Sequence, residues 1–576
     1  MNPETKTCQN CKNQFVIEPE DFNFYEKIKV PPPTFCPRCR LQRRLTFFNI
    51  HYLYKRKCGL CGEEKVSFYP PEAPYNVYCP QCWWGDGWDP FSFGRDYDFS
   101  RPFFEQFNEL LHTAPLLGLS IDLDTARHSP YNHHAGHLKN SYLLFFADFN
   151  EDCAYGFYLI QNKSVMDSSL AASNELLYDC MNVYKVSRGV GLRSQVTESI
   201  DCYFLKDCAN CQNCFASANL RNKKYHIFNK PYTKEEYFKE IKKWDLGSYR
   251  TYQEVKKLAE EHWKKFTPKP RFDEMSARST GNYVFQAKNC KQCFEVIGAE
   301  DSKFLLMTYL PPIKDCWDYT SWGNNVNLLY ECCVSGEAAA NLRFCQESGL
   351  NLYNAEYSKA ATGGSNLFGC VSMKKGDYAI FNKRYTEQEF NELRERIVKH
   401  MNDMPYISEV GSEKRETRKI VYQYGEFFPP DLSPHAYNET LANNFFPMTK
   451  EETLKNGYRW REPDLRTYTI TKKPEDLPDH IKDAPDTILG EVIGCTTCPR
   501  GFKIIHQELN FLRHLNLPLP RRCPFCRIND KFSLWVKNLS VVKRTCYQCG
   551  AEFETSYTES EVPKILCKEC YLKEVV

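Results

Sequence analysis

The sequence lacks the features by which membrane proteins, secreted proteins and common enzymes are recognised. It has no run of about 18 apolar residues, which a membrane-spanning helix requires. No apolar stretch follows Met1, so we expect no secretory leader and a cytoplasmic location. No GxSxG, P-loop or GxGxxG motif stands where it would be functional. We therefore name no catalytic residue and favour a non-enzymatic protein.

The chain also has almost no net charge, at +2 over 576 residues, but the charge is unevenly distributed. Between Lys27 and Lys57 there are nine Lys or Arg and no Asp or Glu. Between Arg513 and Arg544 there are eight, against Asp530 alone. The two ends are therefore basic and the rest of the chain is acidic. With 42% hydrophobic residues the composition is that of an ordered protein, and the length indicates several domains.

Cysteine is the residue that the chain has in excess, with 29 copies, of which sixteen form eight CxxC pairs at the two ends of the chain. The gaps between successive pairs are 24, 18 and 17 residues near the N-terminus and 24, 19 and 17 near the C-terminus. The pairs are Cys8/Cys11, Cys36/Cys39, Cys58/Cys61, Cys79/Cys82, Cys495/Cys498, Cys523/Cys526, Cys546/Cys549 and Cys567/Cys570.

This spacing predicts zinc. A CxxC pair points two thiolates at one ion, and two such pairs complete the tetrahedral shell of a zinc ribbon. Paired cysteines without a leader, in an odd total, favour metal over disulfides. We expect four zinc ions, each held by consecutive pairs, and a cross-braced pairing stays open as the alternative. Because four thiolates close the shell, the ions are expected to be structural and not catalytic.

The cysteine-rich ends are copies of one another beyond their ligands. An offset of 487 residues places Phe15 on Phe502 and Pro31 on Pro518. Shared apolar and proline positions indicate a shared core, so the two ends form an internal repeat.

A second duplication lies between the ends. Residues 225–233, YHIFNKPYT, match residues 378–386, YAIFNKRYT, and each copy leads into a helix-like tract behind a threonine cap, Thr233 or Thr386. Each copy follows a series of short strand-like pieces with polar corners. Such pieces predict a parallel β-helix, which stacks one coil on the next. A pair of antiparallel β-sandwiches is the alternative.

We thus expect a multidomain, mainly β fold, in which two double zinc-ribbon modules flank a duplicated β-rich body with short helical connectors. Connecting helices are predicted over residues 100–112 and 251–266. The expected segments are an N-terminal double zinc ribbon (1–98), a helical connector (99–127), a first β-rich repeat with its C-terminal helix (128–245), a second connector (246–280), a second β-rich repeat with its helix (281–402), an extended arm (403–490) and a C-terminal double zinc ribbon (491–576).

The basic tract of the N-terminal module mixes cations with aromatic residues such as Phe47 and Tyr52. Cations that pair with phosphate, beside rings that stack on bases, suit single-stranded or looped nucleic acid, with RNA preferred. Docking of the basic ends on the acidic body or on another protein explains the tract equally well, and a solvated basic face is the third interpretation. The candidate nucleic-acid contacts are Arg38, Arg40, Arg43, Arg44, Lys55, Arg56, Lys57, Arg521, Arg522, Lys543 and Arg544.

Two smaller clusters are weighed as further metal sites. The cysteines between Cys202 and Cys214, together with Cys290 and Cys293, could bind an ion, but an interior ladder of small side chains in a solenoid is favoured. The histidines between His128 and His137 could hold a metal or act as acid–base groups, but a surface loop at the start of the first repeat is favoured.

Several motifs carry a resemblance to a known group of proteins. They are residues 21–40, DFNFYEKIKVPPPTFCPRCR; residues 78–84, YCPQCWW; residues 97–104, YDFSRPFF; and residues 425–430, GEFFPP. On these motifs the chain resembles the uncharacterised multi-zinc-ribbon proteins of small-genome candidate-phyla bacteria, over most of its length. The resemblance implies a cytoplasmic zinc-ribbon protein and brings no catalytic residue with it.

Together these observations predict a non-enzymatic zinc-binding scaffold or adaptor. Its basic ends are expected to contact nucleic acid or a nucleic-acid-associated protein. A protein-interaction scaffold that works through the β surface, with the ribbons as clamps, is the first alternative. A β-helix enzyme acting on carbohydrate is the second, and it requires carboxylates gathered on one face of the solenoid. We identify no small-molecule substrate and no membrane partner.

Overall fold

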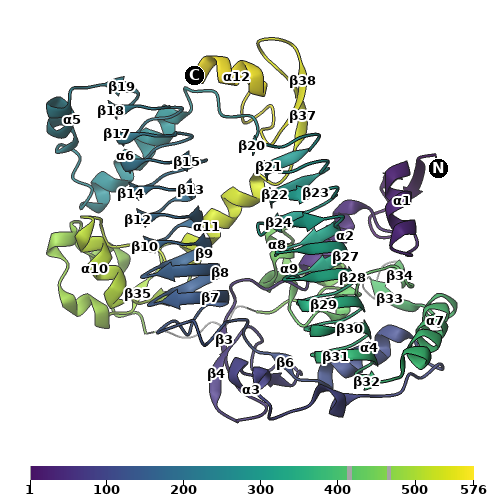
Figure 1. The fold of residues 1–576 in the computed structure, drawn as a ribbon. Coiled ribbons are helices and arrows are strands. Elements are labelled where there is room, and N and C mark those ends of the chain that lie inside the picture. The colour runs from purple at the N-terminus through teal and green to yellow at the C-terminus, as the bar shows by residue number, and fades with distance from the viewer. Residues whose placement is uncertain (1, 411–417, 463–468, 576) are drawn as a thin grey trace. The chain divides into compact units, whose positions relative to one another are not determined.

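The computed structural model describes residues 2–410, 418–462 and 469–575. The chain forms two compact units, each assembled from two stretches that are far apart in sequence (Figure 1). Unit 1 contains Met1–Leu119 and Phe272–Glu462, and unit 2 contains Ser120–Arg271 and Pro463–Val576. Each unit therefore combines one cysteine-rich end with the β-rich repeat that is more distant from it along the chain.

The β-rich repeat of unit 2 is a parallel β-helix, as predicted, and not a β-sandwich. Lys163 pairs with Glu175, which pairs with Ser187, so each of these coils takes twelve residues. Its strands are β7 (His133–Lys139), β8 (Tyr142–Glu151), β9 (Ala154–Ile160), β10 (Lys163–Met166), β11 (Ser169–Ala172), β12 (Glu175–Tyr178), β13 (Met181–Tyr184), β14 (Ser187–Val190), β15 (Val196–Thr197), β16 (Ile200–Tyr203), β17 (Gln212–Phe215) and β18 (Lys224–Ile227). We call it the first solenoid.

The β-rich repeat of unit 1 is a parallel β-helix of the same kind, here called the second solenoid. Its coils vary more in length: Phe294 pairs with Leu306, twelve residues on, and Leu306 pairs with Thr320, fourteen residues on. Its strands are β20 (Asp273–Glu274), β21 (Gly281–Phe285), β22 (Cys293–Ile297), β23 (Ala299–Glu300), β24 (Leu306–Thr308), β25 (Ile313–Lys314), β26 (Trp317–Thr320), β27 (Val326–Cys333), β28 (Ala339–Arg343), β29 (Gly349–Glu356), β30 (Thr362–Phe368) and β31 (Lys374–Ile380).

The coils are narrow because the backbone turns at nearly every third residue. The corner residues of one coil are Leu143, Phe146, Phe149 and Asp152, with φ between 52° and 54°. The residues that follow them fill the interior and are Leu144, Ala147, Asn150 and Cys153. A left-handed conformation is unfavourable for most L-residues, so it persists only where stacked coils enforce it. This three-residue period was not predicted from the sequence.

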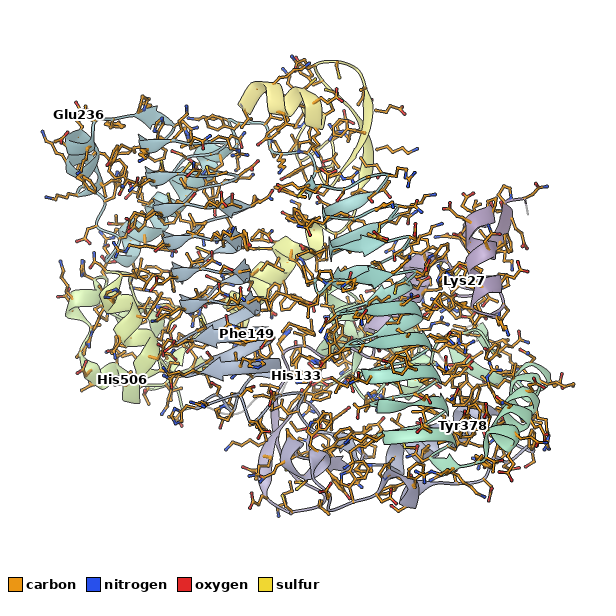
Figure 2. All side chains as sticks on the ribbon, in the orientation of Figure 1. Lys27, His133, Phe149, Glu236, Tyr378 and His506 are labelled. Atoms are coloured by element: carbon orange, nitrogen blue, oxygen red, sulfur yellow. The ribbon has the colours of Figure 1, made fainter. Side chains whose placement is uncertain are left out.

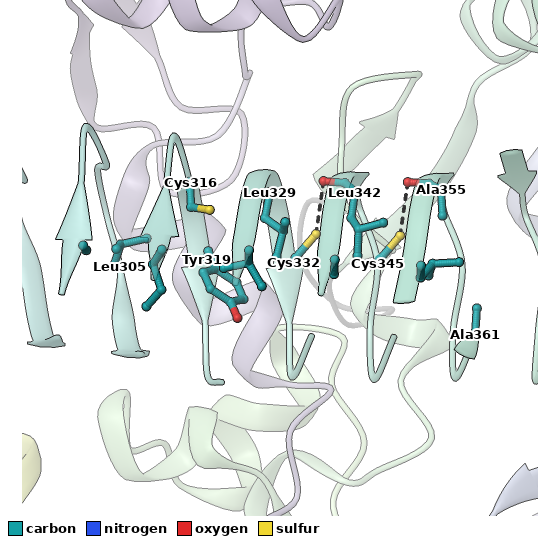
Figure 3. Close-up of a cluster of buried hydrophobic side chains, with 14 of the residues drawn as sticks. Leu305, Cys316, Tyr319, Leu329, Cys332, Leu342, Cys345, Ala355 and Ala361 are labelled. Carbon is teal, nitrogen blue, oxygen red and sulfur yellow. Dashed lines mark hydrogen bonds between the residues drawn. The ribbon is translucent and has the colours of Figure 1, made fainter. Parts of the chain in front are cut away.

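The narrow interior explains twelve of the thirteen cysteines that lie between the two cysteine-rich ends, all of which are buried. In the second solenoid the Cys332 thiol donates to the Leu342 carbonyl, and the Cys345 thiol donates to the Ala355 carbonyl, each at 3.4 Å (Figure 3). A thiol is small enough for the coil and finds a backbone acceptor for its weak donor. The interior ladder favoured from the sequence is therefore confirmed.

Each solenoid ends in the duplicated motif. In unit 2, β18 pairs antiparallel with β19 (Lys230–Pro231), and α5 (Lys234–Ile241) follows behind a Thr233–Glu236 capping box. In unit 1, β31 pairs antiparallel with β32 (Lys383–Arg384), and α7 (Glu387–Asp403) follows behind the matching box at Thr386. The predicted connecting helices are α4 (Phe103–Thr113) and α6 (Tyr249–Trp263).

The two cysteine-rich modules contain the same elements in nearly the same order, which supports the shared core inferred from the repeat. The N-terminal module has β1 (Glu4–Thr7), β2 (Gln14–Ile17), α1 (Pro19–Lys27), α2 (Pro37–Leu45), β3 (Tyr54–Lys57), β4 (Glu64–Ser67), β5 (Val77–Tyr78) and α3 (Pro80–Trp84). The C-terminal module has β35 (Ile493–Gly494), β36 (Gly501–Phe502), α10 (His506–His514), α11 (Pro524–Lys537), β37 (Val542–Thr545), β38 (Glu552–Thr555) and α12 (Lys568–Val575).

The predicted arm, residues 403–490, is divided between the units. Its part in unit 1 includes a hairpin of β33 (Tyr406–Val410) and β34 (Arg418–Tyr422), which the sequence analysis did not predict, and the short helices α8 (Leu441–Phe445) and α9 (Lys450–Lys455). Residues 411–417 and 463–468 of the arm lie outside the described residues. Within the part of the chain that is described, no helix is long and apolar enough to cross a membrane.

Candidate metal centres and the clamps that they position

The sixteen CxxC cysteines gather into four tetrads. In each tetrad the four sulfur atoms all lie within 4.8 Å of one another. The tetrads are Cys8/Cys11/Cys36/Cys39, Cys58/Cys61/Cys79/Cys82, Cys495/Cys498/Cys523/Cys526 and Cys546/Cys549/Cys567/Cys570. Consecutive pairs therefore share a site, as favoured from the sequence, and the cross-braced alternative is wrong.

The sulfur–sulfur distances fit a tetrahedral metal ion. The Sγ atoms are 3.7 Å apart between Cys11 and Cys36, and 3.8 Å apart between Cys549 and Cys567. A tetrahedron with metal–sulfur bonds of about 2.3 Å has edges of about 3.8 Å. A disulfide would require a sulfur–sulfur distance of about 2.05 Å. Each tetrad can therefore hold one metal ion, and its closed set of four thiolates suits a structural role.

Backbone N–H groups donate to one sulfur atom in each of two tetrads and prepare it for metal binding. The Cys79 N–H donates to the Cys58 sulfur at 3.3 Å, and the Cys567 N–H donates to the Cys546 sulfur at 3.2 Å. Burial opposes a charge on the Cys546 sulfur, but the backbone N–H groups outweigh it and lower the pKa of this thiol to about 6. The thiolate, which is the form that binds metal, is therefore favoured.

The first tetrad of each module also starts a helix. Cys36 is the N-cap of α2, and Cys523 is the N-cap of α11, with a proline at the first helical position in both. The fourth ligand, Cys39 or Cys526, lies in the first turn. A metal ion in the tetrad would therefore set where the helix begins and in which direction its next turns point.

The next turns of α2 place three arginines on one face, since residues three and four positions apart are neighbours on a helix. Arg40, Arg43 and Arg44 are each at most 2% exposed. They pair with two carboxylates of the second solenoid and one of the arm. The ion pairs are Arg40–Asp318 at 2.8 Å, Arg40–Glu331 at 3.8 Å, Arg44–Asp318 at 3.0 Å, Arg44–Glu331 at 3.2 Å, Arg43–Glu331 at 2.8 Å and Arg43–Glu426 at 2.8 Å. We call these six residues the N-terminal clamp.

The N-terminal clamp balances buried charge. Asp318 and Glu331 are corner residues of successive coils, so the register of the solenoid holds two carboxylates close together. Burial opposes the charge of Asp318, but Arg40 and Arg44 outweigh it, and the pKa of Asp318 is lowered. Removing one partner of a buried ion pair costs about 3–5 kcal/mol, because the other charge stays buried and unpaired. The three arginines therefore hold α2 on the solenoid.

Unit 2 repeats this arrangement. The offset of 487 residues places Arg527 and Lys531 of α11 on two of the three α2 arginines. Arg527 pairs with Asp167 and, at 2.9 Å, with Glu508 of α10, while Lys531 pairs with Asp179 at 2.9 Å. Asp167 and Asp179 are again corner residues of successive coils, twelve positions apart. We call these five residues the C-terminal clamp.

The second ribbon of each module makes a contact of its own. Trp83 of α3 is 1% exposed, and Lys374 of the second solenoid donates to its carbonyl at 3.1 Å. Tyr571 of α12 is also 1% exposed, and its hydroxyl donates to Asp207, another corner residue of the first solenoid. Each module therefore contacts its solenoid at two places.

Three residues expected to contact nucleic acid are thus buried in the N-terminal clamp. Arg40, Arg43 and Arg44 present no surface to a phosphate outside the protein, because solenoid and arm carboxylates occupy their guanidiniums. These three residues dock a basic end on the acidic body, which is the alternative interpretation given for the basic tract in the sequence. Basic composition alone could not separate the two cases, since both use the same side chains.

The remaining candidate contacts are divided between exposed and engaged side chains. Arg38, Lys55, Lys57 and Lys543 are exposed. The engaged residues are Arg56, which donates to the Pro70 and Tyr75 carbonyls; Arg544, which donates to the Tyr557 and Val562 carbonyls; Arg521, which lies 4.2 Å from the Tyr249 ring centroid; and Arg522, which pairs with Asp530.

The two smaller clusters do not gather like the tetrads. Among the residues that the structure describes, the four tetrads are the groups of three or more Cys, His, Asp or Glu whose ligand atoms lie close enough for a metal. The Cys202 thiol donates instead to the Ile200 carbonyl at 3.3 Å. His133 and His137 belong to strand β7, so the expected surface loop is wrong there. Figure 2 labels His133. His137 Nδ1 lies 2.9 Å from the Asp148 carboxylate, and its ring stacks on Phe149.

The acidic half of both clamps was missed from the sequence. Asp318, Glu331, Asp167 and Asp179 stand in the β-rich repeats with no local motif around them. The spacing of each acidic pair, thirteen or twelve residues, equals one coil, and this is the signal that could have identified them. It has meaning only once the coil length is known.

No protein-family model and no curated protein matches the chain. One matching solved structure is the UDP-N-acetylglucosamine acyltransferase from Campylobacter jejuni, with 6% sequence identity, a TM-score of 0.08, and coverage of 49% of this chain and 90% of that chain. At this score the likeness carries no argument on fold or function.

Proposed function

We propose that the protein is a non-enzymatic, cytoplasmic scaffold in which four zinc ions hold the cysteine-rich modules as clamps on the two solenoids. The observation that carries the proposal is the burial of Arg40, Arg43 and Arg44 against carboxylates of their own unit. Three of the four basic side chains of α2 are used inside the molecule. The working surface is then the outward face of the solenoids.

Zinc suits the tetrads because it takes four thiolates in a tetrahedron and has no redox chemistry. When bound, it supplies a rigid knuckle at the start of α2 and of α11. The chain does the rest: arginine and lysine side chains on the following turns neutralise carboxylates that the stacked coils bring together. Without these cations, stacked buried carboxylates would destabilise the solenoid.

The outward face of the first solenoid supports a protein partner. Charges on neighbouring coils pair with one another there, as in Lys139–Glu151 at 2.6 Å and Arg188–Asp201 at 3.1 Å. Glycoside hydrolysis instead uses two carboxyl groups facing one bond, with a water or sugar between them. A mixed and internally paired charge pattern favours a protein-binding surface over a carbohydrate-active site.

Nucleic-acid contact is the second candidate function, and the cations that stay exposed favour it. Lys55 and Lys57 extend from one ribbon strand, and Lys543 occupies the matching strand of the other module. Tyr547 is 64% exposed, with Lys564 4.7 Å from its ring centroid. An exposed ring beside a cation is suited to stacking on a base next to a phosphate.

Zinc removal tests the clamps. Hydrogen exchange is measured on the full-length protein with four zinc ions per chain and after treatment with a chelator. Loss of zinc is expected to raise exchange in α2 and α11 and in the strands that carry Asp318 and Asp167, because the helices lose their fixed start. Unchanged exchange in α2 after complete zinc loss would contradict the proposal.

Titration with a labelled single-stranded RNA separates the two candidates. If the protein-binding scaffold is correct, we expect no binding that weakens steeply with salt. The alternative result is salt-sensitive binding that is lost in a Lys55→Glu, Lys57→Glu, Lys543→Glu variant. This result would contradict the protein-binding scaffold and support nucleic-acid contact, because phosphate contacts release counterions. A matched control reverses Lys230, Lys234 and Lys257, exposed lysines outside both modules.

A further inference from the structure

A buried histidine of the arm has no hydrogen-bond partner. His435 is 3% exposed, and its ring stacks on Tyr69 with 5.3 Å between centroids and 9° between planes. Phe68 lies against the same ring at 5.5 Å. Neither ring nitrogen has a partner among the described residues. Buried polar groups are nearly always paired, so an unpaired imidazole calls for an explanation.

The surroundings of His435 oppose a positive charge. Burial is the main cause, and Lys359 and Arg459 add to it, so the pKa of His435 is held well below its usual range. The Glu347 carboxylate acts on Tyr69, the ring stacked on His435, and Lys359 already engages this carboxylate at 2.9 Å. Arg459 donates to the Ser433 carbonyl, and Tyr69 stays protonated because burial raises its pKa. A protonated ring would therefore sit among apolar rings and two cations.

His435 lies in a segment that covers the N-terminal clamp, residues 424–441, which we call the strap. Glu426 of the strap accepts from Arg43 at 2.8 Å. Ser433 Oγ donates to the Thr46 carbonyl at 2.6 Å, and the Leu441 N–H donates to the Phe48 carbonyl at 2.8 Å. The strap therefore supplies one carboxylate of the clamp and contacts the residues that follow α2.

We propose that His435 makes the strap an acid-sensitive cover, which leaves the N-terminal clamp when one proton is taken up below about pH 6.5. The proton comes from solvent and binds a ring nitrogen once the strap has opened. The charged ring cannot return to the stack on Tyr69. Opening frees Arg43 from Glu426 and uncovers the chain behind α2. The inference goes beyond the proposed function, because it holds for any partner.

The direction and size of the effect follow from linkage. The docked strap favours the neutral ring, so its stability is present above the ordinary histidine pKa of about 6.5 and is lost as the pH falls below it. One proton makes the opening constant rise about tenfold per pH unit in that range. Between pH 7.5 and 5.5 the expected rise is about tenfold.

The test is hydrogen exchange of the full-length, zinc-loaded protein at pH 7.5 and 5.5, corrected for the intrinsic exchange rates. Strap peptides are expected to show the tenfold rise, and His435→Phe is expected to abolish it. The C-terminal module serves as the internal control, because its tetrads meet the same acid, and zinc content is measured in every sample.

Three results would overturn the inference: no rise in the strap at pH 5.5, an equal rise in His435→Phe, or a rise that follows zinc loss in both modules together. If His435→Phe does not fold, His435→Leu takes its place. An NMR titration of the unmodified protein gives an independent reading. The His435 ring is expected to stay neutral at pH 6 while the strap is docked, and titration near pH 6.5 in the docked state would refute the inference.

Discussion

Both clamps hold a helix on a solenoid through buried ion pairs, but they use different numbers of cations. The N-terminal clamp sets three arginines against three carboxylates, whereas the C-terminal clamp uses Arg527 and Lys531 alone from its helix. The position of Arg43 is taken by Asp530, which is half exposed and pairs with Arg522. The shared features are the helix start at a tetrad and the carboxylates one coil apart. The two clamps therefore share the position of the helix start and the spacing of the carboxylates, but they differ in the number of ion pairs.

The clamps also differ in whether the cations that pair with a solenoid carboxylate all come from the clamp helix. Asp318 is held by Arg40 and Arg44, both from α2. Asp179 is held by Lys531 of α11, but also by Arg193 of its own solenoid and Lys256 of α6, each at 2.9 Å. Burial opposes the charge of Asp179, and these three cations outweigh it, so its pKa is well below the usual range. Asp179 therefore has two cations that do not come from the clamp helix, whereas both cations that pair with Asp318 come from α2.

The largest effect is expected for Arg44→Met. It leaves Asp318 and Glu331 buried with fewer partners, so unit 1 should lose about 3–5 kcal/mol, read from the exchange of its most protected amides. Adding Asp318→Asn to this variant should recover part of the loss, because one unpaired charge is removed. A loss below about 1 kcal/mol would show that water or a shifted side chain replaces the arginine, and that burial was overstated.

A smaller effect, about 1 kcal/mol in unit 2, is expected for Lys531→Met, because Arg193 and Lys256 remain on Asp179. The matched control is Lys537→Met on the same helix, whose side chain is 56% exposed and pairs with Glu561. The control should change stability by less than about 0.5 kcal/mol. Equal losses for Arg44→Met and Lys531→Met would remove the difference between the clamps.

Local features of the fold were predictable from the sequence. The eight CxxC pairs at the two ends form four tetrads, and each knuckle is made within four residues. The parallel β-helix was also predicted, from short strands and polar corners. The three-residue period was not, although Cys202, Cys208, Cys211 and Cys214 are separated by multiples of three. The reason is that corner residues in a left-handed conformation include Leu, Phe and Tyr, which carry no turn signal of their own.

In the basic tract, neighbouring arginines differ in exposure. Arg38 and Arg40 stand two residues apart in the same CPRCR motif, yet the first is exposed and the second is 1% exposed. Their difference arises from a carboxylate 278 residues away, Asp318, and not from any neighbour in the chain. The composition predicts the positive charge of α2, but it does not predict which side of the helix faces a solenoid.

The sequence by itself determined the sixteen ligands, and it favoured the pairing of consecutive knuckles and a solenoid body over their alternatives, because these depend on residues within a few positions or on a repeating pattern. Only the tertiary structure decided which β-rich repeat shares a unit with which cysteine-rich end, and which cations are buried. Those outcomes depend on desolvation and on the register of stacked coils. Both are properties of surfaces that exist only after the chain has folded.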